Sequence, residues 1–174
     1  MQSNLIPRVA QLTACRVGCV VGEAELVLIN NHARRPIAPD KLRIVDWVKE
    51  HSGPSAAGEM DVCFGHYPPS CFIATQHGDM VGYACYNATA KDFFGPTRVL
   101  DELQGKGIGK ALLLKCLWAL REEGYAYAII GGVGPAAFYE KCVGAQMIPG
   151  STPGVYKDFL VALKKGIMGV EIEE

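Results

Sequence analysis

The feature that most constrains the fold is a glycine-rich stretch at residues 104–110, between a β-like run that ends at Val99 and an apolar segment over residues 111–120. Glycines occupy alternate positions 105, 107 and 109 of this stretch. The apolar segment predicts a buried helix. A strand that turns through glycines into a helix presents main-chain N–H groups and the positive end of the helix dipole to an anion. We therefore expect a ligand that carries a phosphate or pyrophosphate group.

Two common phosphate-loop patterns do not fit this stretch. The nucleoside-triphosphate loop requires Gly at position 104 and Ser or Thr at position 111, where the chain has Gln104 and Ala111. The dinucleotide fingerprint, started at Gly105, requires Gly at position 110 and an acidic residue at the end of the next strand. The chain has Lys110, and the run over residues 128–132 contains no acidic residue. A nucleotide hydrolase or a nicotinamide-dependent dehydrogenase is therefore disfavoured.

A third pattern, Gln/Arg-x-x-Gly-x-Gly/Ala, fits without a mismatch at Gln104, Gly107 and Gly109. A second motif, A-x-F/L-Y-x-K followed by Gly, lies downstream and includes Phe138 and Tyr139. One predicted helix and one predicted strand separate the two motifs. In these motifs and in their order, the chain resembles the GCN5-related N-acetyltransferase (GNAT) superfamily over about residues 70–160.

The resemblance implies an α+β fold of three layers. A twisted, mixed and mostly antiparallel sheet is flanked by helices, and its central parallel strand pair splays apart. It also implies an N-acetyltransferase that moves an acetyl group from acetyl-coenzyme A (acetyl-CoA) to a primary amine of a small molecule, peptide or protein. The amine attacks the thioester directly, with no covalent enzyme intermediate and no metal. Many members of the superfamily form homodimers.

The resemblance assigns the cofactor to particular residues. The main chain of Thr97 and Val99 pairs with the pantetheine arm, and an N–H near Val99 or Leu100 polarises the thioester carbonyl. Many members carry an Asn at position 132, where this chain has Gly132, so main chain replaces that contact. Phe138 is included in the cofactor site. The amides that receive the pyrophosphate are those of Gln104, Gly105, Lys106, Gly107, Ile108, Gly109 and Lys110.

Tyr139 is the candidate general acid. A phenol with an ordinary pKa of about 10 stays protonated at neutral pH and can pass its proton to the departing thiolate. The general base stays open between Asp92, His66 and a water chain, because the run over residues 93–98 lacks the Glu that some members carry there. Arg98 can meet an acidic group of the acceptor or form a surface ion pair.

The missing carboxylate leaves a second function open. A GNAT fold without a base can hold an acyl-CoA as a non-catalytic binding or sensing module. The presence of Tyr139 argues against this alternative, because a module without turnover needs no general acid.

Length and charge set limits on the remaining function classes. The 174 residues fit one domain, with residues 1–23 as a loosely attached arm. A net charge of −1 gives no overall field that would favour nucleic acid or an anionic membrane. No apolar run reaches the roughly 18 residues of a membrane span. The chain has 7 cysteines and no C-x-x-C pair, which indicates reduced thiols in the cytoplasm and not a zinc site; four of them lie in apolar runs, Cys71, Cys85, Cys116 and Cys142.

Hydrophobic patterning predicts the other elements. We expect strands at residues 25–30, 71–75, 80–87, 94–99, 125–130, 146–148 and 155–160. We expect helices from Asp40, as N-cap, to residue 52, and over residues 107–123 and the second motif; residues 55–66 are ambiguous. All four histidines fall in predicted loops, and His77 lies in a predicted hairpin turn. The first helix has an apolar stripe of Leu42, Val45 and Val48, with Ile44 and Trp47 alongside.

Overall fold

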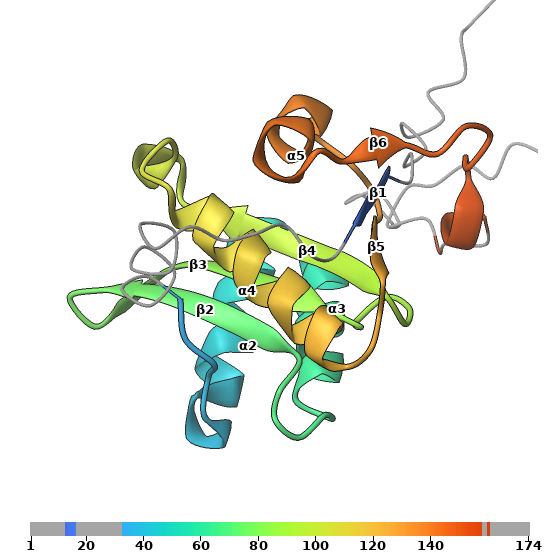
Figure 1. Cartoon of the computed structure of the whole chain (residues 1–174). Coiled ribbons are helices and arrows are strands. Elements are labelled where there is room, and N and C mark those ends of the chain that lie inside the picture. Colours follow the sequence, from blue (N-terminus) through green and yellow to red (C-terminus); the bar gives the residue numbers. More distant parts are fainter. Residues whose placement is uncertain (1–12, 17–32, 158–159, 161–174) are drawn as a thin grey trace, which may run out of the picture.

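The computed structural model describes residues 13–16, 33–157 and 160. The strand predicted at residues 25–30 lies outside these ranges. In chain order, with the labels of Figure 1, the elements are β1 (Thr13–Arg16), the 3-10 helix η1 (Ala38–Asp40), α2 (Lys41–Ser52), α3 (Pro54–Cys63), β2 (Cys71–Gln76), β3 (Asp79–Tyr86), β4 (Phe93–Val99), η2 (Asp101–Leu103), α4 (Ile108–Glu122), β5 (Tyr127–Ile130), α5 (Ala136–Val143), β6 (Gln146–Met147) and η3 (Gly154–Tyr156).

The strands form one mixed sheet in the order β2-β3-β4-β5-β1-β6. Its neighbouring pairs are antiparallel except β4 and β5, which are parallel. Helix α4 covers one face of the sheet, and α2 and α3 cover the other (Figure 1). The predicted three-layer α+β architecture with a central parallel pair is confirmed.

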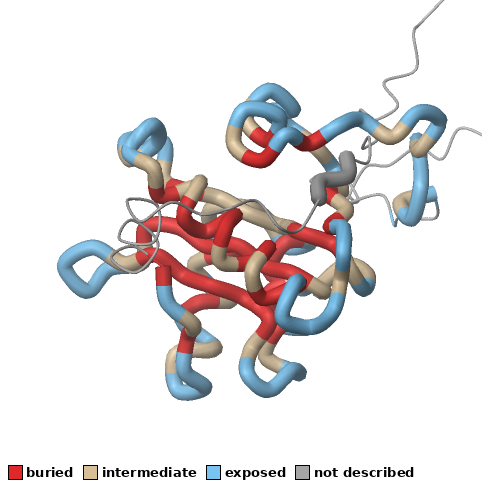
Figure 2. Tube along the Cα trace, viewed as in Figure 1, coloured by how far each residue is buried: buried red, intermediate tan, exposed pale blue. Residues whose placement is uncertain are grey.

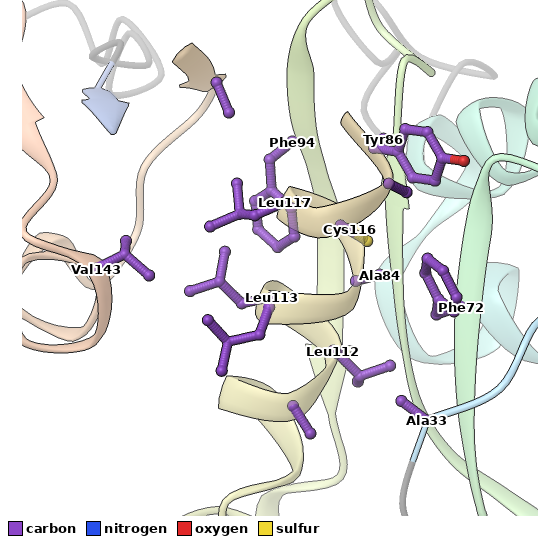
Figure 3. Packing of buried hydrophobic residues seen from close by; sticks show 14 of the residues in the cluster. Ala33, Phe72, Ala84, Tyr86, Phe94, Leu112, Leu113, Cys116, Leu117 and Val143 are labelled. Atoms are coloured by element: carbon purple, nitrogen blue, oxygen red, sulfur yellow. The ribbon is translucent and has the colours of Figure 1, made fainter. Parts of the chain in front are cut away.

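The larger core lies between α4 and the sheet. Side chains of the helix and of the strands face one another across this layer (Figure 3), among them Leu113, Cys116, Ala84 and Phe94. Burial of one leucine side chain stabilises a fold by roughly 1.5–3 kcal/mol, so α4 is firmly held against the sheet. The helix ends before Gly124, whose φ of 95° is the left-handed conformation expected there.

A second core lies between the sheet and the helices α2 and α3. Ile44 and Val48 of α2 are buried there, as the predicted stripe required. Leu42 is 74% exposed, so its place in that stripe was wrong. Asp40 occupies the N-cap position of α2 as predicted, but its side chain makes no capping hydrogen bond. The ambiguous segment forms α3 and buries Met60 on the same core.

The predicted hairpin of β2 and β3 is confirmed. His77 and Gly78 both have positive φ angles, 54° and 94°, which fit the tight turn between these strands. Strand β4 contains an irregularity where Gly95-Pro96 interrupts it. The register of β3 and β4 shifts at Gly95-Pro96, where two residues of β4 oppose one of β3, so the proline falls in a β-bulge.

Two terminal predictions need correction, and a third is confirmed. Residues 13–16, assigned to a loose arm, form β1 between β5 and β6; the rest of that arm lies outside the described residues. The strand predicted at 146–148 is the short β6, paired with β1. The strand predicted at 155–160 is replaced at its start by η3, and residues 158–159 are not described. Burial follows the sheet and α4, while the connecting loops are exposed (Figure 2).

Candidate functional site

The central parallel pair opens into a wedge. β5 pairs with β4 only at Phe93 and Phe94, opposite Ile129 and Ile130. Among the described residues, the rest of β4 has no partner strand on that side, and residues 95–98 are half-buried. The closed end of the wedge is therefore at Phe94, and its open end leads toward the glycine-rich loop.

The main chain of β4 faces this opening. Val99 lies opposite Gly82 in register, and the Leu100 N–H donates to the Val81 carbonyl oxygen at 3.0 Å. This makes Val99 part of a non-hydrogen-bonded pair, so its N–H and C=O groups point away from β3. The same register holds for Thr97. Leu100 was predicted as an alternative donor to the thioester, and that part of the prediction was wrong because its N–H is committed to β3.

The glycine-rich loop presents donors in a row. No hydrogen-bond acceptor for the N–H groups of residues 105–109 is found in the described part of the chain. Gly107 has a φ of 86° and directly precedes α4, so the loop turns sharply into the helix. The exposed Lys106 adds positive charge beside these amides. The sequence predicted an anion seat here, and the open amides have the character that such a seat needs.

Gln104 has a different part in the loop from the one expected. Its N–H donates to the Asp101 carbonyl oxygen at 3.3 Å, so this amide is not open to a ligand. Its side-chain Nε2 donates to Asp101 Oδ1 at 2.9 Å and lies 3.5 Å from the Val99 carbonyl oxygen. The side chain of Gln104 therefore holds the loop against the end of β4. Its main-chain N–H is not one of the donors to the pyrophosphate, contrary to the prediction.

Helix α5 closes the cofactor side of the wedge. A Cβ atom built on Gly109 would lie 3.7 Å from both Phe138 Cζ and Val99 Cγ2. Val99 of β4, Gly109 of α4 and Phe138 of α5 were all predicted for the cofactor site, and they lie next to one another. Gly132, also predicted, lies exposed in the connection between β5 and α5, with a φ of 62°.

Tyr139 lies at the closed end of the wedge. Its ring packs edge-on against Phe94, with 6.0 Å between the ring centres, and against Phe138 at 5.1 Å. Burial, with a smaller effect of Cys142, raises the pKa of Tyr139 to about 12. Tyr139 therefore stays protonated across the physiological pH range.

Comparison with known proteins shows which family part of this chain resembles. The family model described as the acetyltransferase (GNAT) domain matches residues 68–142, which span the hairpin, the wedge, the glycine-rich loop and most of α5. The matched part of the chain is similar to a GNAT domain, and the described sheet and helices have the GNAT fold. No curated protein matches the chain significantly.

Solved structures agree on this fold. A glucosamine N-acetyltransferase region of a fungal multi-domain GH3 β-N-acetylglucosaminidase aligns with a TM-score of 0.62 at 10% identity, over 80% of this chain and 20% of that one. A GCN5-related N-acetyltransferase from Sphaerobacter thermophilus aligns with a TM-score of 0.53 at 16% identity, over 80% and 48%. The chain spans less than half of either protein, and likenesses this distant show the fold alone.

Neither base that the sequence offered lies well for the wedge. Asp92 precedes β4, and its carbonyl oxygen accepts the Ile129 N–H at 2.8 Å. It therefore lies beyond the closed end of the wedge. The Nδ1 atom of His66 is 2.7 Å from Ser70 Oγ, just before β2 and two strands away from the open edge of β4. Burial does raise the pKa of Asp92, and its Oδ1 has no partner in the described part of the chain. Position along the sheet is what argues against both residues as the base.

Glu59 of α3 is a carboxylate that no sequence motif singled out. Its Oε1 accepts a hydrogen bond from the Thr89 hydroxyl. Burial raises the pKa of Glu59, and this hydrogen bond opposes the rise. Thr89 and Glu59 also act on the hydroxyl of Tyr156, which lies so close to Gly131 that a Cβ there would collide with it. Since Gly131 directly follows β5, Thr89 and Tyr156 connect Glu59 to the closed end of the wedge, on the face opposite Tyr139.

A sequence signal for Glu59 did exist. Ala56, Glu59 and Cys63 follow at helical spacing, so the carboxylate shares a face with two buried side chains. The other acidic residue of α3, Asp61, lies on the surface and pairs with Lys41 at 2.9 Å. The signal was unusable because the helix itself was ambiguous.

The structure also places the other polar and thiol side chains that the sequence singled out. Arg98 pairs with Asp101 at 3.4 Å, which is the surface ion pair expected as one of its two roles. His51 lies in α2, within the helix predicted to residue 52, and stacks on Trp47, so its inclusion among the loop histidines was wrong; His32 is not described. The predicted burial is confirmed for three cysteines, while the fourth is only partly buried; in that order they are Cys71, Cys85, Cys116 and Cys142.

Metal sites and membrane spans are two further possibilities for such a chain. In the described ranges, no group of three or more His, Cys, Asp or Glu side chains is arranged to hold a metal ion. No described helix combines the length and apolar character that a membrane span needs.

Proposed function

We propose that this chain transfers an acetyl group from acetyl-CoA to a primary amine by direct attack. The observation that carries the proposal is a continuous row of main-chain N–H and C=O groups that faces the wedge and ends beside a tyrosine side chain. It runs from the open amides of residues 105–109, along the free edge of β4, to Tyr139 at the closed end of the wedge.

Each part of acetyl-CoA has a matching part of this row. The amides of residues 105–109 suit the pyrophosphate, because they sit at a helix N-terminus and lack other acceptors in the described part of the chain. The edge of Thr97 and Val99 suits the amide groups of the pantetheine arm, as an added strand would. The Val99 N–H is the donor we assign to the thioester oxygen, where charge develops during attack.

The proton transfers use one residue on each face of the sheet. We assign the base to Glu59, whose raised pKa makes its carboxylate a better acceptor for a proton of the substrate ammonium, so that the neutral amine can attack. Attack forms the C–N bond, collapse of the tetrahedral intermediate breaks the C–S bond, and the nitrogen releases its extra proton to solvent, from which Tyr139 regains the proton that it gives to the sulfur. Tyr139 then donates to the departing sulfur. With a pKa of about 12, it serves first as a hydrogen-bond donor that stabilises the thiolate.

The alternative of a non-catalytic acyl-CoA module rested on the missing carboxylate. Glu59 supplies a carboxylate from α3, so that ground no longer favours the module. The acceptor class under this proposal stays a primary amine of a small molecule, peptide or protein. We also propose the cytoplasm as its compartment, since buried thiols such as Cys71 and Cys116 suit a reducing environment.

Thermal shift and thiol release test the proposal together. We expect acetyl-CoA to raise the melting temperature while ATP and NAD do not. We expect release of free coenzyme A thiol that depends on an added amine. Stabilisation by acetyl-CoA without release for any amine in a broad panel would support the binding module instead.

A further inference from the structure

The face of the sheet opposite α4 carries a second set of polar groups beside the wedge. Arg98 lies between Thr97 and Val99 on β4, and side chains alternate along a strand. Val99 packs in the core under α4, so Arg98 projects to the face of α2 and α3. There it lies opposite Tyr83 of β3, which belongs to the core of that face.

Three polar atoms on this face are buried without a hydrogen-bond partner in the described part of the chain: Ser52 Oγ, Tyr83 Oη and Arg98 Nε. Tyr83 is 0% exposed, and burial raises its pKa well above the ordinary value. Arg98 and Tyr83 are register partners on adjacent strands, and Ser52 and Arg98 both oppose this rise in the pKa of the Tyr83 phenol.

Such an arrangement is costly unless a ligand completes it. A buried donor without an acceptor costs roughly 1–3 kcal/mol, and native proteins contain few of them. The Arg98 guanidinium pairs with the Asp101 carboxylate, and this contact is long, at 3.4 Å. Its Nε–H can only donate, and the two hydroxyls can donate as well. Donors around a guanidinium match a carboxylate better than any neutral group.

The opposite charge lies on the same face. Glu59 belongs to α3, which packs on this face together with Tyr83. Burial chiefly raises the pKa of the Tyr83 phenol, with smaller opposing effects of Glu59, which raises it, and Arg98, which lowers it. Trp47 packs edge-on against Tyr83, with 6.2 Å between ring centres, and supplies an apolar wall. A ligand whose amine points toward Glu59 and whose anionic group points toward Arg98 would pair with both of these charged groups.

We propose that the acceptor is an amine that also carries a carboxylate, and that Arg98, Tyr83 and Ser52 bind this carboxylate. The inference rests on the proposed function for the direction of the amine. Arg98, Tyr83 and Ser52 are specificity-determining residues under this proposal, and none of them takes part in bond making.

Matched amine pairs test the proposal. Serine and ethanolamine, tyrosine and tyramine, and lysine and cadaverine differ by one carboxylate. With acetyl-CoA saturating, thiol release gives KM and kcat for each. We expect KM to be at least tenfold lower for the carboxylate-bearing member of at least one pair. Equal KM values within all three pairs would overturn the proposal.

Variants separate this subsite from a structural role. Tyr83→Phe keeps the buried ring and removes only the hydroxyl, and Arg98→Gln removes the charge. Both should raise KM for the carboxylate-bearing amine by roughly ten- to a hundredfold, leave the decarboxylated partner unchanged, and leave kcat nearly constant. Arg98→Lys should rescue only part of the loss. Arg43→Gln, at an exposed arginine of α2, is the matched control and should keep the preference.

Failure of the proposed function gives a different result. Calorimetry with the same six amines, in the presence of coenzyme A, measures binding without turnover. Binding of an amino acid that Arg98→Gln abolishes would support the subsite even if no thiol is released. Turnover of ethanolamine, tyramine or cadaverine, with a preference that neither variant alters, would uphold acetyl transfer and overturn the subsite.

Discussion

The two faces of the wedge offer different kinds of chemistry to their ligands. On the side of α4 and α5, the groups that face the opening are mostly main-chain amides of β4 and of the glycine-rich loop. On the side of α2 and α3, they are side chains: Glu59, Tyr83, Arg98 and Ser52. Main-chain donors are fixed by the fold and change little with sequence. Side-chain donors can be exchanged without disturbing the sheet, so we expect this face to set the choice of acceptor.

The largest expected effect is a loss of affinity for acetyl-CoA when the glycine-rich loop is changed. Gly109→Glu places a negative side chain into the row of amides, against Phe138 and Val99, and should weaken acetyl-CoA binding at least a hundredfold. Gly109→Ala is the matched control, because its Cβ would make ordinary contacts at 3.7 Å and alanine favours the helix. Calorimetry with acetyl-CoA measures both. Wild-type affinity in the glutamate variant would remove the loop from the cofactor site.

The next effect tests the side-chain face. Glu59→Gln should lower kcat by roughly a hundred- to ten-thousandfold, because the base is lost, while the affinity for acetyl-CoA stays unchanged. Since the pKa of Glu59 is raised, the wild-type rate should fall as pH drops through that raised value, and the variant should lack this limb. A pH–rate profile of both proteins decides the matter. The same acidic limb in the variant would point to a different base.

Tyr139→Phe should have a smaller effect, about ten- to a hundredfold on kcat, since water can replace part of the donation. A phenol with a pKa of about 12 remains protonated up to high pH, so Tyr139 should cause no loss of rate between about pH 7 and 10. Steady-state thiol release over that range provides the measurement. An unchanged kcat would reduce Tyr139 to a packing residue against Phe94.

The smallest effect is on stability. Tyr83→Phe removes a buried hydroxyl that has no partner in the described part of the chain, so without ligand the free energy of unfolding should stay level or rise by about 1 kcal/mol. Denaturant unfolding of the ligand-free proteins measures it. A loss of more than about 1 kcal/mol would mean that the hydroxyl has a structural partner, and the carboxylate subsite would lose its main support.

The difference between main-chain and side-chain recognition also explains which features the sequence could predict. Glycines at 105, 107 and 109 are visible as a pattern, so the loop, α4 and the parallel pair followed from it, and Tyr139 from the motif on α5. Leu100 and Gln104 were assigned wrongly because the direction of a single N–H depends on strand register and on local turns. Such detail is not encoded in residue type.

The side-chain face left no comparable pattern. Glu59, Tyr83 and Arg98 come from three elements that are distant in the sequence, and each residue type is common on protein surfaces. Their significance arises only from burial and from their nearness in the fold. Strand β1 was missed for a related reason, since residues 13–16 join the sheet only through pairing with β5 and β6.

The bulge at Gly95-Pro96 decides which group faces which ligand. Phe94 and Val99 are five positions apart, an odd number, yet both lie in the core under α4. An uninterrupted strand would put them on opposite sides. The extra residue shifts the phase of β4 by one, and only after that shift do the amides of Thr97 and Val99 point into the gap while the guanidinium points to the other side. Deleting one residue at this bulge would exchange the groups of β4 that face acetyl-CoA with those that face the acceptor. No side chain that contacts either substrate would itself be replaced.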